Sequence, residues 1–120
     1  MNIALICDME KKESTIQFCK RYENILMYNK IYLPEDLKDD LDKIINLKYF
    51  ETLYCDENAK EQIFTRIFYE EIDIFLFFRT PKEFKHKNKI DFDLLNLCDS
   101  LSLPYATNFK TAEILLENLI

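Results

Sequence analysis

The chain of 120 residues contains no glycine and no tryptophan. Average composition would give roughly eight glycines in this length. The abundant residues Lys, Asn, Ile, Phe and Tyr have A/T-rich codons, so a strongly AT-biased genome accounts for the deficit. Bias alone rarely removes a glycine that must adopt positive φ. The sequence therefore predicts that no position strictly requires glycine, and it contains no GxxxxGK[ST] phosphate loop.

Metal and redox motifs are also missing. The four cysteines, Cys7, Cys19, Cys55 and Cys98, form no CxxC pair, which argues against a zinc site or a redox dithiol. We expect them to be small buried residues in a reducing compartment. The sequence therefore predicts no metal and no cofactor.

Long apolar runs are absent as well. No run approaches the ~20 residues that span a bilayer, and the N-terminus lacks the basic start of a signal peptide. We therefore expect a cytoplasmic location and no membrane partner. The formal net charge of −6 argues against nucleic-acid binding, which normally uses a basic face. A local basic loop could still attract a small anionic metabolite.

Apolar patterns predict five strand–helix repeats in a single domain that covers residues 1–120. The predicted strands are Asn2–Cys7, Lys30–Leu33, Phe50–Cys55, Ile72–Phe78 and Pro104–Thr107. Helical spacing predicts one helix over Thr15–Met27 and another that begins at Pro34 and includes Ile44 in its apolar stripe. Helical crossovers imply parallel strands with helices on both faces, which is a three-layer α/β/α sandwich.

Ligands of such sheets bind outside the carboxyl ends of the strands. Two carboxylates are expected there, because Asp8 and Asp56 follow the first strand and a buried third strand. Each could move a proton or hold a metal ion. Each could instead cap the N-terminus of the next helix, and the sequence leaves both interpretations open.

Basic residues gather after the fourth strand. Arg79 ends that strand, Thr80 follows it, and the loop beyond carries four lysines around His86, the only histidine. This loop could attract an anion and supply a group that titrates near neutral pH. It could equally be a solvated charged loop.

Other polar residues complete this edge of the sheet. Lys60, near the start of a helix, could bind a phosphate or could be a surface lysine. Thr107 and Asn108 follow the fifth strand, where they could bind a ligand or cap the last helix. The predicted anion site consists of Lys60, Arg79, Thr80, Thr107 and Asn108.

Two segments of the C-terminal half carry a family resemblance. They are "EEIDIFLFFRTP" and "LLNLCDSLSLPYATNFKTAEILL". Two shorter segments share the resemblance to the same family. "NIALICD" resembles the first strand of its members, and Glu61-Gln62 resembles part of their central motif. The matching positions are Ile72-Asp73, Pro81, Leu94-Leu95, Pro104, Ala106-Thr107-Asn108 and Thr111-Ala112. Together these segments resemble the methylglyoxal synthase family over nearly the whole chain.

The resemblance implies a five-stranded parallel sheet of order 3-2-1-4-5 and a homo-oligomer, usually a hexamer. It also implies an enzyme that eliminates phosphate from dihydroxyacetone phosphate to give methylglyoxal, without metal or cofactor. The same fold serves as a regulatory or substrate-binding module in larger nucleotide-pathway enzymes.

The chain departs from the family's motifs where that chemistry is located. The family has a histidine-aspartate pair after the first strand, where this chain has Cys7-Asp8-Met9 and so only an aspartate. It has a Thr/Gly phosphate loop where this chain has "LPEDLKDD". Ungapped counting from Asp73 places Lys60 at the family's catalytic aspartate. His86 lies one residue out of register with the family's loop histidine. A protonated lysine cannot act as the base, and the carboxylates would repel a phosphate.

These departures favour a diverged family member without the parent activity, which acts as a small-anion-binding or oligomeric scaffold module. The alternative is an active methylglyoxal synthase, a carbon–oxygen lyase, with a rearranged site. Asp8 or Asp56 would then be the base and His86 the acid. A third hypothesis is a phospho-receiver domain, since Asp8, Asp56 and Thr80 follow strands one, three and four. That hypothesis requires a sheet of order 2-1-3-4-5.

Overall fold

Strands and helices alternate along the chain in the computed structural model, which describes residues 1–54, 57–81 and 88–119. The strands are β1 (Asn2–Cys7), β2 (Lys30–Pro34), β3 (Tyr49–Leu53), β4 (Ile74–Phe78) and β5 (Tyr105–Ala106). The helices are η1 (Met9–Lys11), α1 (Lys12–Arg21), α2 (Glu23–Leu26), α3 (Glu35–Leu41), α4 (Glu57–Phe68), α5 (Lys89–Ser100) and α6 (Phe109–Glu117). Within the described residues, no helix is long and apolar enough to cross a bilayer.

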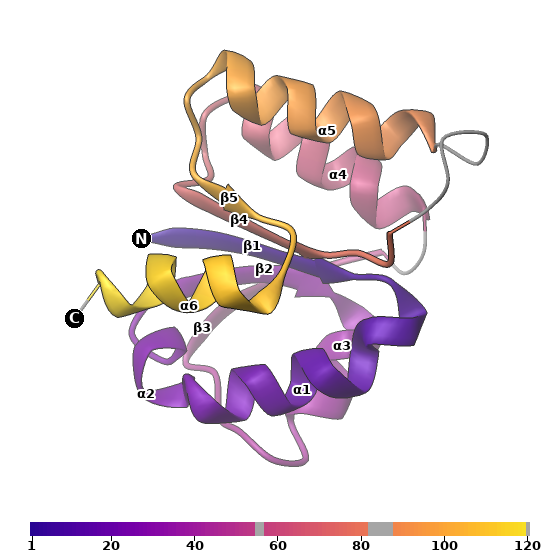
Figure 1. Ribbon diagram of the computed structural model, residues 1–120. Coiled ribbons are helices and arrows are strands. Elements are labelled where there is room, and N and C mark those ends of the chain that lie inside the picture. The colour runs from indigo at the N-terminus through magenta and orange to yellow at the C-terminus, as the bar shows by residue number, and fades with distance from the viewer. Residues whose placement is uncertain (55–56, 82–87, 120) are drawn as a thin grey trace.

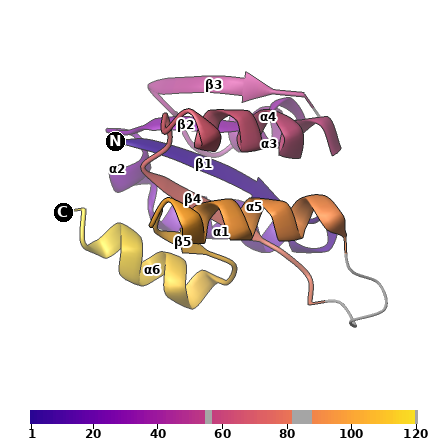
Figure 2. The ribbon, with the colours of Figure 1, turned by 90° about the horizontal axis from the view of Figure 1, so that it is seen from above.

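The five strands form one parallel sheet in the order β3-β2-β1-β4-β5 (Figure 2). The central strand β1 pairs with β2 and β4, and Ile3 lies opposite Ile31 on one side and Ile74 on the other. This arrangement confirms the predicted fold class and the strand order that the family resemblance implied. It contradicts the phospho-receiver hypothesis, which required a different order.

Helices cover both faces of the sheet, with α4 and α5 on one face and α1, α2, α3 and α6 on the other (Figure 1). All five residues of β4 are buried because this strand lies inside the sheet and both of its faces are covered. Phe75 and Phe77 pack under α4 and α5, whereas Leu76 and Phe78 pack on the opposite face. The continuous apolar run in the sequence therefore marks a strand buried on both sides.

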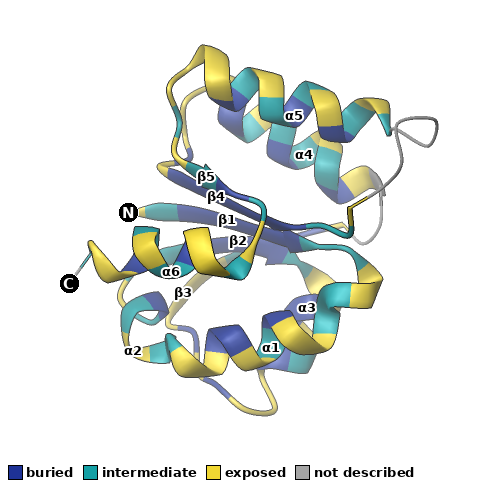
Figure 3. Ribbon diagram, viewed as in Figure 1, coloured by how far each residue is buried: buried dark blue, intermediate teal, exposed yellow. Residues whose placement is uncertain are grey.

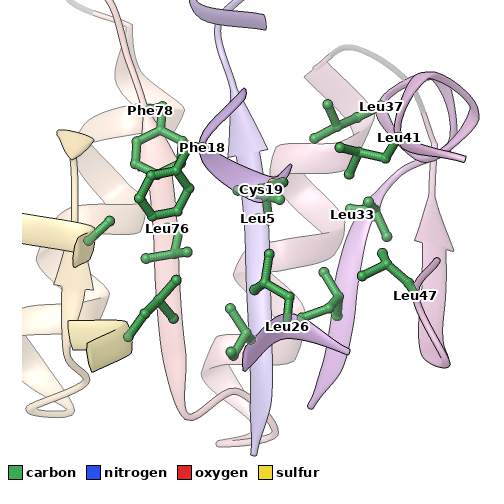
Figure 4. Packing of buried hydrophobic residues seen from close by; sticks show 14 of the residues in the cluster. Leu5, Phe18, Cys19, Leu26, Leu33, Leu37, Leu41, Leu47, Leu76 and Phe78 are labelled. Atoms are coloured by element: carbon green, nitrogen blue, oxygen red, sulfur yellow. The ribbon is translucent and has the colours of Figure 1, made fainter. Parts of the chain in front are cut away.

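Buried residues follow the sheet and the inward faces of the helices (Figure 3). On the face of α1 and α6, Phe18 packs edge-on against Phe78, with ring centroids 5.2 Å apart (Figure 4). Phe109 stacks on Phe78 at 4.3 Å. These rings join α1, β4 and α6 into one apolar core, which holds the end of β4 in place.

The predicted buried third strand is instead an edge strand. β3 pairs with β2 alone, and its first residues Tyr49 and Phe50 are 58% and 44% exposed. Aromatic residues are favoured in strands whether or not they are covered, so composition could not distinguish an edge from a centre. Cys55, the predicted end of this strand, lies outside the described residues.

Two helix boundaries also differ from the prediction. The single helix predicted over Thr15–Met27 begins at Lys12 and is interrupted at Tyr22, after which α2 brings Leu26 to the core. Pro34 is the last residue of β2 and is extended, so it precedes α3 instead of starting it. Ile44 lies beyond the end of α3 and is exposed.

The chain forms two glycine-type helix ends without glycine. Glu70 follows α4 and Ser102 follows α5, with φ angles of 57° and 55°. After α5, Leu103 N–H donates to Cys98 C=O at 2.9 Å and Ser102 N–H donates to Asp99 C=O at 3.2 Å. This pairing is the Schellman motif, whose left-handed residue is usually glycine. The structure therefore has positions that favour glycine but tolerate another residue.

We expect Ser102→Gly to raise the free energy of unfolding by about 0.5–1 kcal/mol. Glycine removes the left-handed strain of about 1–2 kcal/mol but loses part of that gain to unfolded-state entropy. The matched control is Ser100→Gly at the last helical residue of α5, which should lower stability by up to about 0.5 kcal/mol. Urea denaturation of both variants measures this, and stabilisation by both substitutions would contradict the explanation.

Candidate functional site

A cavity of about 420 Å³ opens at the carboxyl ends of β1 and β2. Its charged lining residues are Asp8, Lys12, Asp36 and Lys60, and its other lining residues are Ile6, Cys7, Met9, Pro34, Leu37 and Ala59. Ligands of doubly wound sheets bind outside the carboxyl ends of the strands, near the point where the strand order reverses. The cavity is therefore the candidate functional site.

Asp8 joins the ends of β1 and β4. Its backbone N–H donates to Phe78 C=O at 2.9 Å, and its Oδ2 accepts from the backbone N–H of Thr80 at 2.7 Å. Asp8 occupies the N-cap position of η1, as one interpretation of the sequence expected, but its side chain makes no capping hydrogen bond. The carboxylate is instead fixed at the cavity wall by the neighbouring strand.

Lys12 lies on the opposite side of the cavity and is held by two carboxylates of α3. Its Nζ lies 2.7 Å from Asp40 Oδ2 and 3.4 Å from Asp36 Oδ2. The hydrogen bond that Lys12 donates to Asp40 raises the pKa of Lys12 and lowers the pKa of Asp40. The acidic segment "LPEDLKDD" therefore neutralises a lysine of the cavity.

Lys60 forms the most buried ion pair of the site. Its Nζ lies 2.8 Å from Asp91 Oδ1, and the two side chains are only 12% and 5% exposed. The same Nζ lies 5.4 Å from the ring centroid of Phe77. Lys60 is therefore not a surface lysine, because its ammonium joins α4 to α5.

Sequence reasoning missed both Asp91 and Lys12. A signal existed for Asp91, because it shares the buried face of α5 with Leu94 and Cys98, where a carboxylate is out of place. Lys12 lies four residues after Asp8, in a stretch that gave no reason to prefer it over Lys11. Neither pairing could be deduced without the spatial arrangement of the helices.

Arg79 and Thr80 lie beside the cavity and do not line it. Arg79 contributes to a separate cavity of about 140 Å³ that Asp91 also lines. The Nε of Arg79 and the Oγ1 of Thr80 are buried, and within the described part of the chain neither has a hydrogen-bond partner. Only the backbone of Thr80 takes part in the site, through its bond to Asp8.

The remaining predicted residues are placed elsewhere. Asn108 caps α6, since its Oδ1 accepts from Thr111 N–H at 2.9 Å, and neither Asn108 nor Thr107 lines either of these two cavities. Asp56 and His86 lie outside the described residues. The five predicted anion-binding residues thus do not surround one cavity, and anion binding by them stays a prediction.

Two further features define the chemistry of the site. Gln62 Oε1 accepts from the backbone N–H of Tyr54 at 2.7 Å, which ties the start of α4 to the end of β3. Burial raises the pKa of the half-buried thiol of Cys7, so this cavity residue is a poor nucleophile at neutral pH. Within the described part of the chain, no cluster of three metal-ligating side chains is present.

Comparison with known proteins identifies the family. No family model matches the chain. A methylglyoxal synthase of Caldicellulosiruptor saccharolyticus is 34% identical over 120 residues, which cover 99% of this chain and 84% of that protein. The chain belongs to the methylglyoxal synthase family. A methylglyoxal synthase of Natranaerobius thermophilus is 31% identical, and the alignment covers 100% of both chains.

A solved structure of the same family has the same fold. The crystal structure of methylglyoxal synthase from Elizabethkingia anophelis superposes with a TM-score of 0.79. The match covers 96% of this chain and 76% of that chain, at 19% sequence identity. The family assignment that the sequence motifs suggested is confirmed, and the departures at the site can be interpreted within one fold.

Breaking the pair between Lys60 and Asp91 should destabilise the protein strongly. We expect Lys60→Met to cost about 3 kcal/mol, because it leaves a buried carboxylate without a counter-charge. Adding Asp91→Leu to this variant should restore most of the loss, since the pair is then replaced by apolar packing.

Chemical denaturation of the single and double variants measures this coupling. The control pair is Lys89 and Asp93, 2.8 Å apart on the exposed side of α5, where Lys89→Met should change stability by less than about 0.5 kcal/mol. Equal effects at the two pairs would contradict a structural role for Lys60.

Proposed function

We propose that this member of the methylglyoxal synthase family binds a small molecule in the cavity without eliminating phosphate from dihydroxyacetone phosphate. The observation that supports this is the ion pair of Lys60 with Asp91. By ungapped counting, Lys60 takes the position of the family's catalytic aspartate. A lysine whose ammonium is held by a buried carboxylate cannot accept the proton that the elimination must remove.

The charge balance of the cavity supports the same proposal. Two lysines, Lys12 and Lys60, face four carboxylates in and around the cavity, those of Asp8, Asp36, Asp40 and Asp91. The formal charges of these six side chains sum to −2. A phosphate dianion is held by donors whose charge is available to it, and both ammonium groups here already have carboxylate partners. The small-anion ligand expected from the sequence remains a prediction that this balance disfavours.

An active enzyme is the second candidate. Relatives that are 31% and 34% identical are named methylglyoxal synthase, and the carboxylate of Asp8 lines the cavity, where it could act as the base. The other members of this rearranged site would be Asp56 and His86. Turnover of dihydroxyacetone phosphate separates the two candidates.

We expect the purified protein to release no more phosphate and methylglyoxal from dihydroxyacetone phosphate than buffer does. The reason is that the base is replaced and the cations are already paired. The C. saccharolyticus enzyme, assayed alongside, serves as the positive control. Turnover that Asp8→Asn abolishes would refute the proposal and establish the active enzyme.

A scaffold role would require self-association, which the family resemblance implied. The exposed aromatic residues Tyr49 and Phe50 on the unpaired edge of β3 support it, because such an edge can pair with a second copy. We expect the protein to sediment as an oligomer and Phe50→Lys to weaken the association. A monomer at all concentrations in analytical ultracentrifugation would exclude the scaffold role.

A further inference from the structure

We infer that the cavity selects a small organic cation, an ammonium group on a short apolar body. This inference rests on the proposed function, because it assigns a ligand class to the same cavity. The inference starts from the charged residues of the cavity and from whether each has a partner of opposite charge. Lys12 is paired with Asp36 and Asp40, and Lys60 is paired with Asp91.

Asp8 is the unpaired charge. Among the described residues, no lysine or arginine forms an ion pair with Asp8, and its Oδ2 accepts one hydrogen bond, from Thr80 N–H. A carboxylate has about four acceptor sites on its two oxygens, so Asp8 can accept donors from a ligand beside its bond to Thr80. A charged group at a cavity wall with spare acceptors is complementary to an ammonium donor.

Asp8 is also held in position before any ligand arrives. Its backbone is bonded to Phe78 and its side chain to Thr80, so both ends of the residue are fixed by the end of β4. A preorganised acceptor loses little side-chain entropy on binding. The carboxylate of Asp8 is therefore preorganised to bind a ligand, unlike the carboxylate of a flexible surface residue.

The rest of the cavity suits an alkyl chain. Ile6, Leu37 and Ala59 lie beneath its surface and are almost fully buried, and the more accessible Met9 and Pro34 add apolar surface to its lining. A volume of about 420 Å³ accommodates a small metabolite. An ammonium at Asp8 with a few carbons against this lining would use both kinds of surface.

An anion would meet an energetic obstacle at each lysine. To reach Lys60 it must displace Asp91, which is 5% exposed and would be left buried without a counter-charge. To reach Lys12 it must compete with two carboxylates on α3. The net charge of −6 on the chain adds long-range repulsion.

Isothermal titration with three probes of similar shape tests the inference. The probes are n-butylammonium, 1-butanol and butyrate, with inorganic phosphate as a fourth titrant. We expect n-butylammonium to bind at least about tenfold more tightly than 1-butanol, and butyrate and phosphate to bind more weakly than either. This comparison uses the unmodified protein, so it does not depend on any variant folding.

A charge-matched pair of variants then locates the site. Asp8→Asn should weaken n-butylammonium binding about tenfold and leave 1-butanol binding unchanged. Glu10→Gln removes the same charge from an exposed residue of η1 that does not line the cavity, and it should change the affinity by less than about twofold.

Tighter binding of butyrate or phosphate, binding of none of the probes, or equal effects of the two variants would overturn the inference. The assay with dihydroxyacetone phosphate decides the proposed function separately. A protein that binds butyrate and does not turn over dihydroxyacetone phosphate would keep the proposed function and reject the cationic ligand.

Discussion

The buried ion pair of Lys60 and Asp91 is the interaction on which the rest of the site depends. It joins α4 to α5 on one face of the sheet, above Phe77, and it places a fixed positive charge beside the cavity. A buried pair adds little net stability over apolar packing, but losing one partner is costly. Once both residues are present, neither can change alone. The pair therefore holds the lysine at the position that ungapped counting assigned to the family's catalytic aspartate.

The fold could be predicted from the sequence because its strongest signals are local. β4 is a continuous apolar run, and amphipathic segments separate the strands, which together define parallel strands with helices on both faces. The sheet order came from the family resemblance. Two predictions were wrong. β3 has the composition of a strand, but its first residues are exposed and not buried. Pro34 is compatible with the end of a strand as well as with the start of a helix, and it ends β2.

The site was harder to predict because its chemistry lies in pairings between distant elements. The sequence placed Asp8 and Lys60 at the correct edge of the sheet, since the carboxyl ends of parallel strands are known once the strands are. It could not show that Lys60 contacts Asp91, 31 positions later, or that Lys12 contacts Asp36 and Asp40 across two helices. Asn108 looked like a ligand residue, but local capping geometry accounts for it fully.

The absence of glycine and the buried charge of Lys60 have different physical explanations. Glu70 and Ser102 show that this chain accepts left-handed strain at helix ends, at the edge of the sheet away from the cavity. Mutational bias can therefore remove glycine wherever the cost is about 1 kcal/mol. It gives no account of the buried charge of Lys60, because a lysine inside the protein is stable only with a counter-charge such as Asp91 opposite it. Among the described residues that line the cavity, both lysines are paired with carboxylates, whereas Asp8 has no lysine or arginine partner, so a ligand of this cavity must be compatible with that carboxylate.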